Sequence, residues 1–267
     1  MPLVINTNVL SDKTISILNA KNDELSSTME RLASGNRITK PSDDAGGLAV
    51  SSKMTAAQKR NRAVGDNIEN ALSFLQTQDG GLETTQKILE RVSELKVLAS
   101  DQTKSQEDKD NYQTEFKALI TQVNNVIVGE TFNNVGLFGT TTRDVLITEN
   151  GQKVVSLIAC GLTTAVTSVF TAISTLASLN ITAITSAIQN VATLRAQNGA
   201  TSSRLSFALS MLDINNTNLG AANSRIKDTD IAETSKELAQ VSILQQAAAA
   251  MLAQANAAPR VALSLLQ

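Results

Sequence analysis

The C-terminal segment, Ile231 to Gln267, is the strongest constraint on how this chain folds. Its apolar side chains recur at steps of three, four and seven residues, so one helix face carries them all: Leu238, Val241, Ala248, Leu252 and Ala255. Many alanines surround that face, so another backbone can approach closely. Pro259 lacks an N–H and is predicted to stop the helix. Because so apolar a helix is costly to leave in water, we predict that it packs on another helix.

A matching pattern lies near the N-terminus. Six positions step by three and four residues, which is typical of the a/d seam of a coiled coil: Ile15, Leu18, Asn22, Leu25, Met29 and Leu32. An Asn in such a seam lowers stability and sets the register, and Asn22 is the polar position here. We therefore predict that the N- and C-terminal helices pair. An ordinary amphipathic helix in a globular core is the open alternative.

Composition excludes several function classes. With a net charge of −2 and a pI near 5.3, the chain has no basic field for nucleic acid and no polybasic membrane patch. It has no His and one Cys, which excludes Ser-His-Asp catalysis, His metal sites and an intrachain disulfide. No Gly-rich phosphate loop is present. We predict no enzyme and no catalytic, cofactor or metal site.

Export and membrane signals are also absent. The first twenty residues lack the continuous apolar run of a secretory signal, so an exported chain would leave by another route. Residues 154 to 174 are long enough to span a bilayer, but they are rich in Ser and Thr and have no basic flank. A strand followed by a surface connection is favoured there, without membrane insertion.

Three further helices are predicted between the termini. A helix from Leu48 to Ser100 has apolar residues at seven-residue intervals, and Gly80-Gly81 indicates a kink or a close helix contact. Before it, Pro41 marks a break and a domain boundary, and Ser42 or Asp43 is a candidate cap. A second helix begins after Ser105 as N-cap. The third, Ile184 to Ile226, keeps a seven-residue repeat that implies supercoiling. The apolar positions are Ile68, Leu75, Leu82 and Leu89 in the first helix, then Tyr112, Phe116, Leu119, Val123 and Val126 in the second.

The middle of the chain predicts a β-hairpin. Asn150-Gly151 accepts the positive φ angles of a type I′ turn, in which Ile147 would face Val154 and Leu146 would face Val155. The predicted fold class is mainly α, a long-helix coiled-coil bundle with a small β-hairpin element and paired terminal helices. The predicted domains are residues 1–44 with 228–267, and residues 45–227, with the hairpin region at about 139–183.

Several motifs resemble bacterial flagellin. They cover residues 1 to 138 and 184 to 267, in matching order and at matching distances from each terminus. The motifs are Val4-Ile5-Asn6-Thr7-Asn8, Glu30-Arg31-Leu32-Ala33-Ser34-Gly35, Ser42-Asp43-Asp44-Ala45-Gly46, Ser224-Arg225-Ile226-Lys227-Asp228-Thr229-Asp230, Ile243-Leu244-Gln245-Gln246, Leu252-Ala253-Gln254-Ala255-Asn256 and Val261-Ala262-Leu263-Ser264-Leu265-Leu266. The chain resembles a short flagellin with a minimal central region.

The resemblance implies a structural subunit that polymerises into the extracellular flagellar filament. The terminal helices would form the inner-tube domain and residues 45–227 the outer-tube domain. It also implies type III export, a chaperone on the C-terminal helix, and cap and hook-junction partners.

Recognition by a Toll-like receptor is a further implication of the resemblance. Arg91, Leu95 and Glu115 match the family positions concerned. The chain departs from the family at Lys96 and at Ala118, where Gln is usual, and at Asn134, where Gly is common. Filament packing alone is the other interpretation of the three residues.

Three rival functions remain open at this stage. A flagellin-like surface adhesin or polysaccharide receptor would bind glycan as a monomer. A hook–filament junction protein would share the flagellin-like ends. An enzyme with its active site in the central segment is the third, but that segment has no His and no cluster of acidic residues from which to build such a site.

Overall fold

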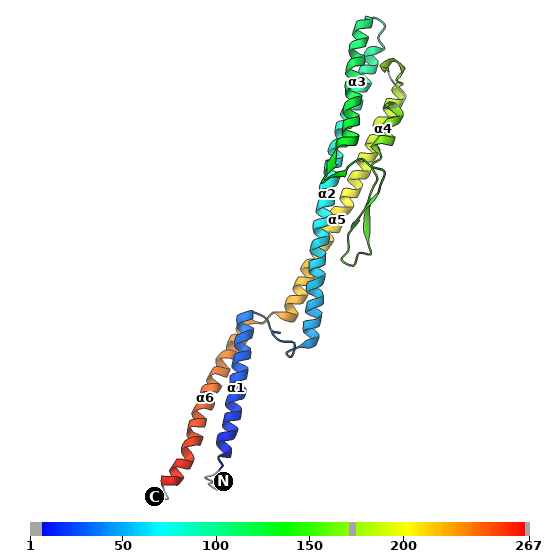
Figure 1. The fold of residues 1–267 in the computed structure, drawn as a ribbon. Coiled ribbons are helices and arrows are strands. Elements are labelled where there is room, and N and C mark those ends of the chain that lie inside the picture. The colour runs from blue at the N-terminus through cyan, green and yellow to red at the C-terminus, as the bar shows by residue number, and fades with distance from the viewer. Residues whose placement is uncertain (1–6, 171–174, 265–267) are drawn as a thin grey trace. The chain divides into compact units, whose positions relative to one another are not determined.

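The computed structural model describes residues 7–170 and 175–264. The fold is mainly α, with long helices and two short antiparallel hairpins, as the sequence predicts (Figure 1). In chain order the elements are α1 (Val9–Ser34), α2 (Ala45–Ala99), α3 (Gln106–Gly129), β1 (Thr131–Phe132), β2 (Val135–Gly136), β3 (Arg143–Leu146), β4 (Val154–Leu157), α4 (Leu162–Phe170), the 3₁₀ helix η1 (Leu176–Ser178), α5 (Ile181–Lys227) and α6 (Ile231–Ser264).

Packing divides the chain into two compact units. The terminal unit comprises Met1–Ala56 with Asn218–Gln267, and the central unit comprises Ala57–Thr217. The sequence places the division in the loops near Asp44 and Asp228. The packing contacts instead place the division within α2 and within α5. Each of these helices is continuous, and its two ends pack in different units.

Local signals explain how the terminal unit's helices begin and end. Asn8 caps α1, since its Oδ1 accepts a hydrogen bond from Ser11 N at 3.1 Å. The helix ends at Gly35, whose φ of 68° is the left-handed conformation that glycine allows. Asp230 caps α6 by accepting from the backbone N of Ala232 and Glu233.

Two expectations for the terminal unit's helix ends are wrong. The cap of α2 is Asp44, whose Oδ1 accepts from Gly47 N at 2.7 Å; Asp43 instead accepts from the backbone N of Thr39 and Lys40. Because α2 begins at Ala45, the N-cap position falls on Asp44, while the Asp43 carboxylate is occupied by the backbone of the preceding loop. The other error concerns Pro259, because α6 continues through it to Ser264. A proline removes one helical hydrogen bond, and the flanking alanines are strong helix formers that sustain the helix.

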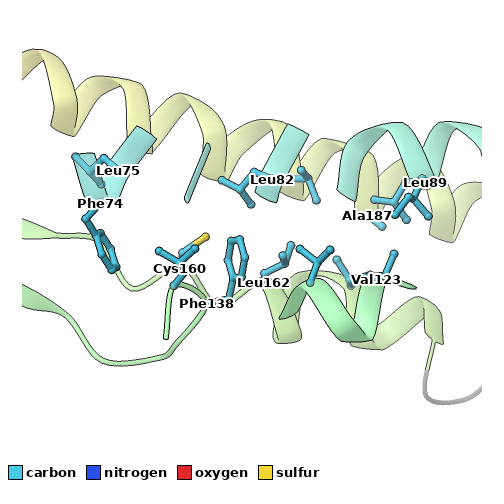
Figure 2. Close-up of a cluster of buried hydrophobic side chains, with 14 of the residues drawn as sticks. Phe74, Leu75, Leu82, Leu89, Val123, Phe138, Cys160, Leu162 and Ala187 are labelled. Atoms are coloured by element: carbon cyan, nitrogen blue, oxygen red, sulfur yellow. The ribbon is translucent and has the colours of Figure 1, made fainter. Parts of the chain in front are cut away.

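The central unit has an apolar core between α2, α3 and α5. The predicted residues of α2, Ile68, Leu75, Leu82 and Leu89, are all buried, as are Phe116, Val123 and Val126 of α3. A capping box between Ser105 and Asp108 begins α3, as predicted. The α5 repeat is buried through Ile184, Val191, Asn198, Leu205 and Leu212. Figure 2 shows side chains of α2, α3 and α5 meeting those of the β region and α4 in this core.

The glycine pair of α2 meets an aromatic ring from a loop rather than the expected close neighbouring helix. A Cβ at Gly81 would lie 2.6 Å from Phe138 Cζ, whereas a Cβ at Gly80 would meet nothing within 4 Å. Phe138 follows β2, and its ring packs on the helix where Gly81 has no side chain. The contact is held by Gln78, whose Nε2 donates to Leu137 O at 2.6 Å.

The predicted hairpin exists, but its turn and register differ. Leu146 pairs with Val154 and Val145 with Val155, one residue away from the prediction. Gly151 N bonds to Thr148 O at 3.1 Å, and Gly151 alone in that turn has a positive φ, of 70°. The turn is therefore longer than a two-residue type I′ turn. The type I′ geometry occurs instead between β1 and β2, where Asn133 and Asn134 have φ angles of 50° and 62°.

The segment after β4 is not a simple surface connection. It forms α4, whose Leu162 and Val166 are buried in the central core, and then η1, whose Leu176 is buried. Lys96 of α2 donates from Nζ to the carbonyls of Leu176 and Ala177, which holds η1 on the unit. Leu162, Val166 and Leu176 thus contribute to the core of the central unit. Within the described residues, no helix is long and apolar enough to cross a membrane.

Candidate functional site

The candidate site is the antiparallel pair formed by α1 and α6. On α6, the buried line contains every residue predicted for the C-terminal seam. Val241, Ala248 and Ala255 are buried, and Leu238 and Leu252 are half-buried. Thr234 extends the same line towards the start of the helix. The alanines allow the two backbones to approach closely.

On α1, the residues named for the seam separate into two lines. Leu18, Leu25 and Leu32 are half-buried and face α6, together with the buried Ser11, Thr14 and Thr28. Ile15 and Met29 are 41 % and 55 % exposed, and Asn22 is exposed as well. Ile15 and Met29 each follow a buried threonine, and Asn22 follows the half-buried Lys21, so each lies about 100° round the helix from that neighbour. The line Ile15–Asn22–Met29 therefore borders the α1–α6 contact.

The two threonines of the buried line are satisfied within their own helix. The hydroxyls of Thr14 and Thr28 donate to Leu10 O and Glu24 O, at 2.7 and 2.8 Å. Such residues can be buried without an unpaired donor. Thr14, Lys21 and Thr28 lie seven residues apart. The two threonines of this repeat are the sequence signal for the buried side of α1, and a search for apolar residues alone misses it.

Polar contacts set the register of the pair. At one end, Asn8 Nδ2 donates to Ala255 O at 2.9 Å and Ser11 Oγ to Asn256 Oδ1 at 2.8 Å. Further along, Gln245 Nε2 donates to Asn22 Oδ1 at 3.2 Å. Asn22 therefore contacts α6 from the border of the helix–helix contact rather than from its centre.

At the other end of the pair, two of the sequence motifs meet. Arg37 N donates to Lys227 O at 2.6 Å, and Thr229 N donates to Gly35 O at 3.0 Å. The Arg37 guanidinium also donates to Ile226 O. These bonds join the loop after α1 to the loop before α6. Of the flanking motifs, residues 4–6 and 265–266 lie outside the described residues.

Charged groups of the terminal unit lie at its exposed edges. Lys21 pairs with Glu24 at 2.6 Å, Lys236 with Glu233 at 3.2 Å, and Lys40 with Glu30 at 2.8 Å. The pKa of Lys40 is raised, chiefly by its hydrogen bond to Glu30. None of these ion pairs joins α1 to α6, so the charge pairs do not hold the two helices together.

Large apolar residues remain uncovered on both helices of the pair. They are Val9, Leu10, Ile15, Ile17 and Met29 on α1, and Ile231, Ile243, Leu244 and Met251 on α6. We call these nine residues the open apolar surface. Exposed large apolar side chains in such number on one helix pair are typical of an interaction site. The helix pair is thus incomplete as a folded unit by itself.

The three residues matched to receptor recognition lie in the central unit. Arg91 binds Glu115 of α3 through two hydrogen bonds, of 2.7 and 3.1 Å, and Glu94 through a third. These bonds hold the pKa of Glu115 below its usual range and raise that of Arg91. Arg91 and Glu115 are partly exposed, but Leu95 is fully buried in the core.

The central unit also has an open groove between α2 and α5. Its volume is about 420 Å³, and Asp79, Arg195, Asn198 and Ser202 are among its lining residues. Arg195 is held by Asp79 at 3.0 and 3.2 Å, which raises the pKa of its guanidinium. Within the described ranges, no group of three or more His, Cys, Asp or Glu side chains could hold a metal ion.

A mainly helical fold with an open apolar helix pair is typical of a structural, self-associating protein. Residues 5–142 match the family model of the bacterial flagellin N-terminal helical region, and residues 181–266 match that of the C-terminal helical region. The chain therefore belongs to the bacterial flagellin family. Flagellins are the structural subunits of the flagellar filament, which lies outside the cell.

Relatives along the whole chain agree with this assignment. A flagellin from Halalkalibacterium halodurans is 35 % identical over 90 % of both chains. The flagellar filament core protein flaB2 of Brachyspira hyodysenteriae is 34 % identical over 99 % of this chain and 100 % of its own. The crystal structure of Bacillus cereus flagellin has the same fold, with a TM-score of 0.50 and 23 % identity over 55 % of this chain and 88 % of that one.

Proposed function

We propose that this chain polymerises into a flagellar filament by packing the α1–α6 pair of each copy against those of other copies. The open apolar surface supports this proposal, since it places large apolar side chains where a single chain leaves them in water. Fully burying one such side chain stabilises an assembly by about 1.5–3 kcal/mol. Assembly would therefore supply the burial that the isolated pair lacks.

The same surface bears on how the subunit reaches the filament. Before assembly, α6 exposes Ile243, Leu244 and Met251, which favours a chaperone on this helix until export. The proposal includes export through the flagellar type III channel, growth of the filament beneath a cap protein, and joining to the hook through junction proteins. The role is structural, without catalysis.

Binding by a Toll-like receptor is a separate proposal. Arg91 and Glu115 support it, because they pair across α2 and α3 on a partly exposed surface. Leu95 would act only through packing, since it is buried. A reporter-cell assay with purified monomer tests this, with Arg91→Ala expected to reduce the signal and Leu95 variants judged only if their circular dichroism is unchanged. No signal from the wild-type monomer contradicts the proposal.

Assembly through the terminal pair is tested with the full-length chain. Ile243→Asp combined with Met251→Asp places charge on the open apolar surface, and both sites are exposed in the single chain, so folding should be retained. The variant should fail to form filaments in negative-stain electron microscopy after seeding, and should stay in the supernatant on centrifugation. Ala253→Asp, at an exposed site beside this surface, is the matched control and should still polymerise.

The outcomes separate the rival functions. Filaments from the double variant at wild-type yield would contradict assembly through this surface. A wild-type chain that stays monomeric under all conditions and binds glycan would support the adhesin instead. A chain that adds to hook ends but does not elongate would support the hook–filament junction protein.

A further inference from the structure

The central unit carries two outward-facing stripes that the terminal pair does not involve. On α5, six exposed residues step by three and four, namely Ala200, Ser203, Phe207, Ser210, Ile214 and Thr217. On α3, six exposed residues follow the same steps, namely Asn111, Thr114, Ala118, Thr121, Asn125 and Val128. We call them the α5 stripe and the α3 stripe. This spacing is that of a coiled-coil seam, on the side of each helix opposite the core.

The two stripes match in length and in charge. Each covers the same number of residues, which corresponds to about 26 Å of helix. Neither contains a charged side chain. The outward face of α2 beside the α5 stripe differs, because it bears the exposed Lys59, Arg62 and Asp66.

The stripes also complement each other in size. The α5 stripe carries Phe207 and Ile214, 76 % and 62 % exposed, with Met211 beside them at 65 %. The middle of the α3 stripe is small, with Thr114, Ala118 and Thr121. The two threonine hydroxyls donate to Asp110 O and Lys117 O within their own helix, so covering them leaves no donor unpaired. The small residues of the α3 stripe therefore leave room above them for large apolar side chains such as Phe207 and Ile214.

The directions of the helices agree with such a contact. Both α3 and α5 run antiparallel to α2 (Figure 1). For α3, Glu115 contacts Arg91, and the later Val126 lies near the earlier Gly81. For α5, Asn198 contacts Leu75, and the later Leu209 lies near the earlier Gly65. The two stripes of one chain therefore point the same way and lie at different heights along α2. A second copy shifted by roughly 35 Å along the axis, without being turned over, would set its α3 parallel to α5 of the first.

We propose that the α5 stripe of one copy docks on the α3 stripe of the next, as a parallel helix–helix seam between central units. The proposal rests on the filament role proposed above and adds a second contact to it. Because the contact joins two different surfaces, it leaves one stripe of each kind free and extends the polymer instead of closing a dimer.

Cysteine cross-linking in assembled filaments tests the seam and its register. A Thr121→Cys chain is mixed with a Ser203→Cys, Ser210→Cys or Thr217→Cys chain, since these three positions lie one heptad apart on the α5 stripe. After mild oxidation, one of the three mixtures should give a disulfide-linked dimer on a non-reducing gel, because a disulfide requires Cα atoms within about 7 Å. Thr121→Cys with Ser206→Cys, outside the stripe, should give none. The wild-type chain, with only the buried Cys160, is the blank.

A charge-insertion experiment gives an independent readout. Phe207→Glu with Ile214→Glu should raise the critical concentration for polymerisation about tenfold or more, since it removes apolar burial and inserts two charges. Ser206→Glu, exposed and beside the stripe, should change it about twofold at most. Circular dichroism of the monomers checks that each variant is folded.

The results distinguish this seam from the filament role itself. Filaments that form normally, with no dimer in any of the three mixtures and no change in critical concentration, overturn the seam alone. A dimer formed by Ser210→Cys by itself would place α5 against α5 and overturn the choice of α3. A wild-type chain that forms no filament overturns the proposed function and the seam with it.

Discussion

At the residue scale, the two adjacent glycines of α2 have opposite environments. A Cβ at Gly81 would overlap the Phe138 ring, and Phe138 is itself buried, so the ring cannot move away freely. A Cβ at Gly80 would point into open space.

Alanine substitutions at the two glycines should therefore change stability in opposite directions. Gly81→Ala should lower the free energy of unfolding by about 1–3 kcal/mol through overpacking. Gly80→Ala should raise it by about 0.5–1 kcal/mol, because alanine is the better helix former. Urea unfolding followed by circular dichroism measures both. Equal effects at the two sites would contradict the ring contact.

Cys160 is buried in the central core, beside Phe138 and Leu162 (Figure 2). Burial raises the pKa of its thiol to about 11, from an ordinary value of 9.0. The folded chain therefore holds this proton at a pH where the unfolded chain has released it. The contribution of the protonated Cys160 thiol to the free energy of unfolding is complete below pH 9.0, and it is lost as the pH rises towards about 11.

This burial predicts a pH dependence that belongs to Cys160. Between pH 9.0 and about 11, the free energy of unfolding should fall more steeply for the wild type than for Cys160→Ser. Paired urea titrations at several pH values measure the difference, and the comparison cancels the titration of Lys and Tyr. The thiol should also react slowly with a thiol reagent in the native chain and fast in urea. Parallel pH profiles, or rapid native labelling, would argue against a buried thiol.

At the element scale, the turn between β1 and β2 depends on two asparagines with positive φ angles. Asparagine tolerates this conformation better than other residues with a Cβ, and glycine tolerates it best at the second position of a type I′ turn. The turn places Phe132, whose ring meets Phe74 of α2 edge to face at 6.0 Å between centroids. The hairpin thereby anchors the chain after α3 to the core.

Substitutions at Asn134 should follow this preference. Asn134→Gly should keep or raise the free energy of unfolding by a few tenths of a kcal/mol, whereas Asn134→Val should lower it by about 1–2 kcal/mol, because a β-branched residue is strained at a positive φ. Thermal unfolding monitored by circular dichroism measures the order. Equal stability of the Gly and Val variants would show that the turn contributes nothing to the fold.

At the scale of the whole molecule, the two units differ in how completely they are packed. The central unit buries a contiguous core of leucine, isoleucine, valine and phenylalanine. Between α1 and α6, the fully buried apolar residues are Val241, Ala248 and Ala255 in the described part of the chain. Little apolar area is therefore removed from water in the terminal pair of a single chain.

Hydrogen exchange should report this difference. In the monomer, the amides of α1 and α6 should exchange much faster than those near Leu82 or Leu205, because local opening costs least where packing is sparse. In the filament, the α1 and α6 amides should become protected. Mass spectrometry of exchanged monomer and filament measures both states. Strong protection of α1 and α6 in the monomer would contradict a pair completed by assembly.

The sequence by itself determined the helices and the family of this protein. Heptad spacing predicted α2, α3, α5 and α6, because the 3.6-residue period of a helix acts within a few residues along the chain. Capping at Ser105 was readable for the same reason. The terminal motifs, from Val4 to Leu266, identified a flagellin without any structure.

Only the tertiary structure decided which side of each helix is buried and where the irregular segments pack. The α1 pattern is compatible with two neighbouring lines, and the choice of Thr14 and Thr28 over Ile15 and Met29 depends on the alanine surface of α6, far away in sequence. The one-residue shift of the β3–β4 register and the helix α4 were equally out of reach. Those features depend on contacts between distant residues, such as Leu162 in the central core, and no local pattern contains them.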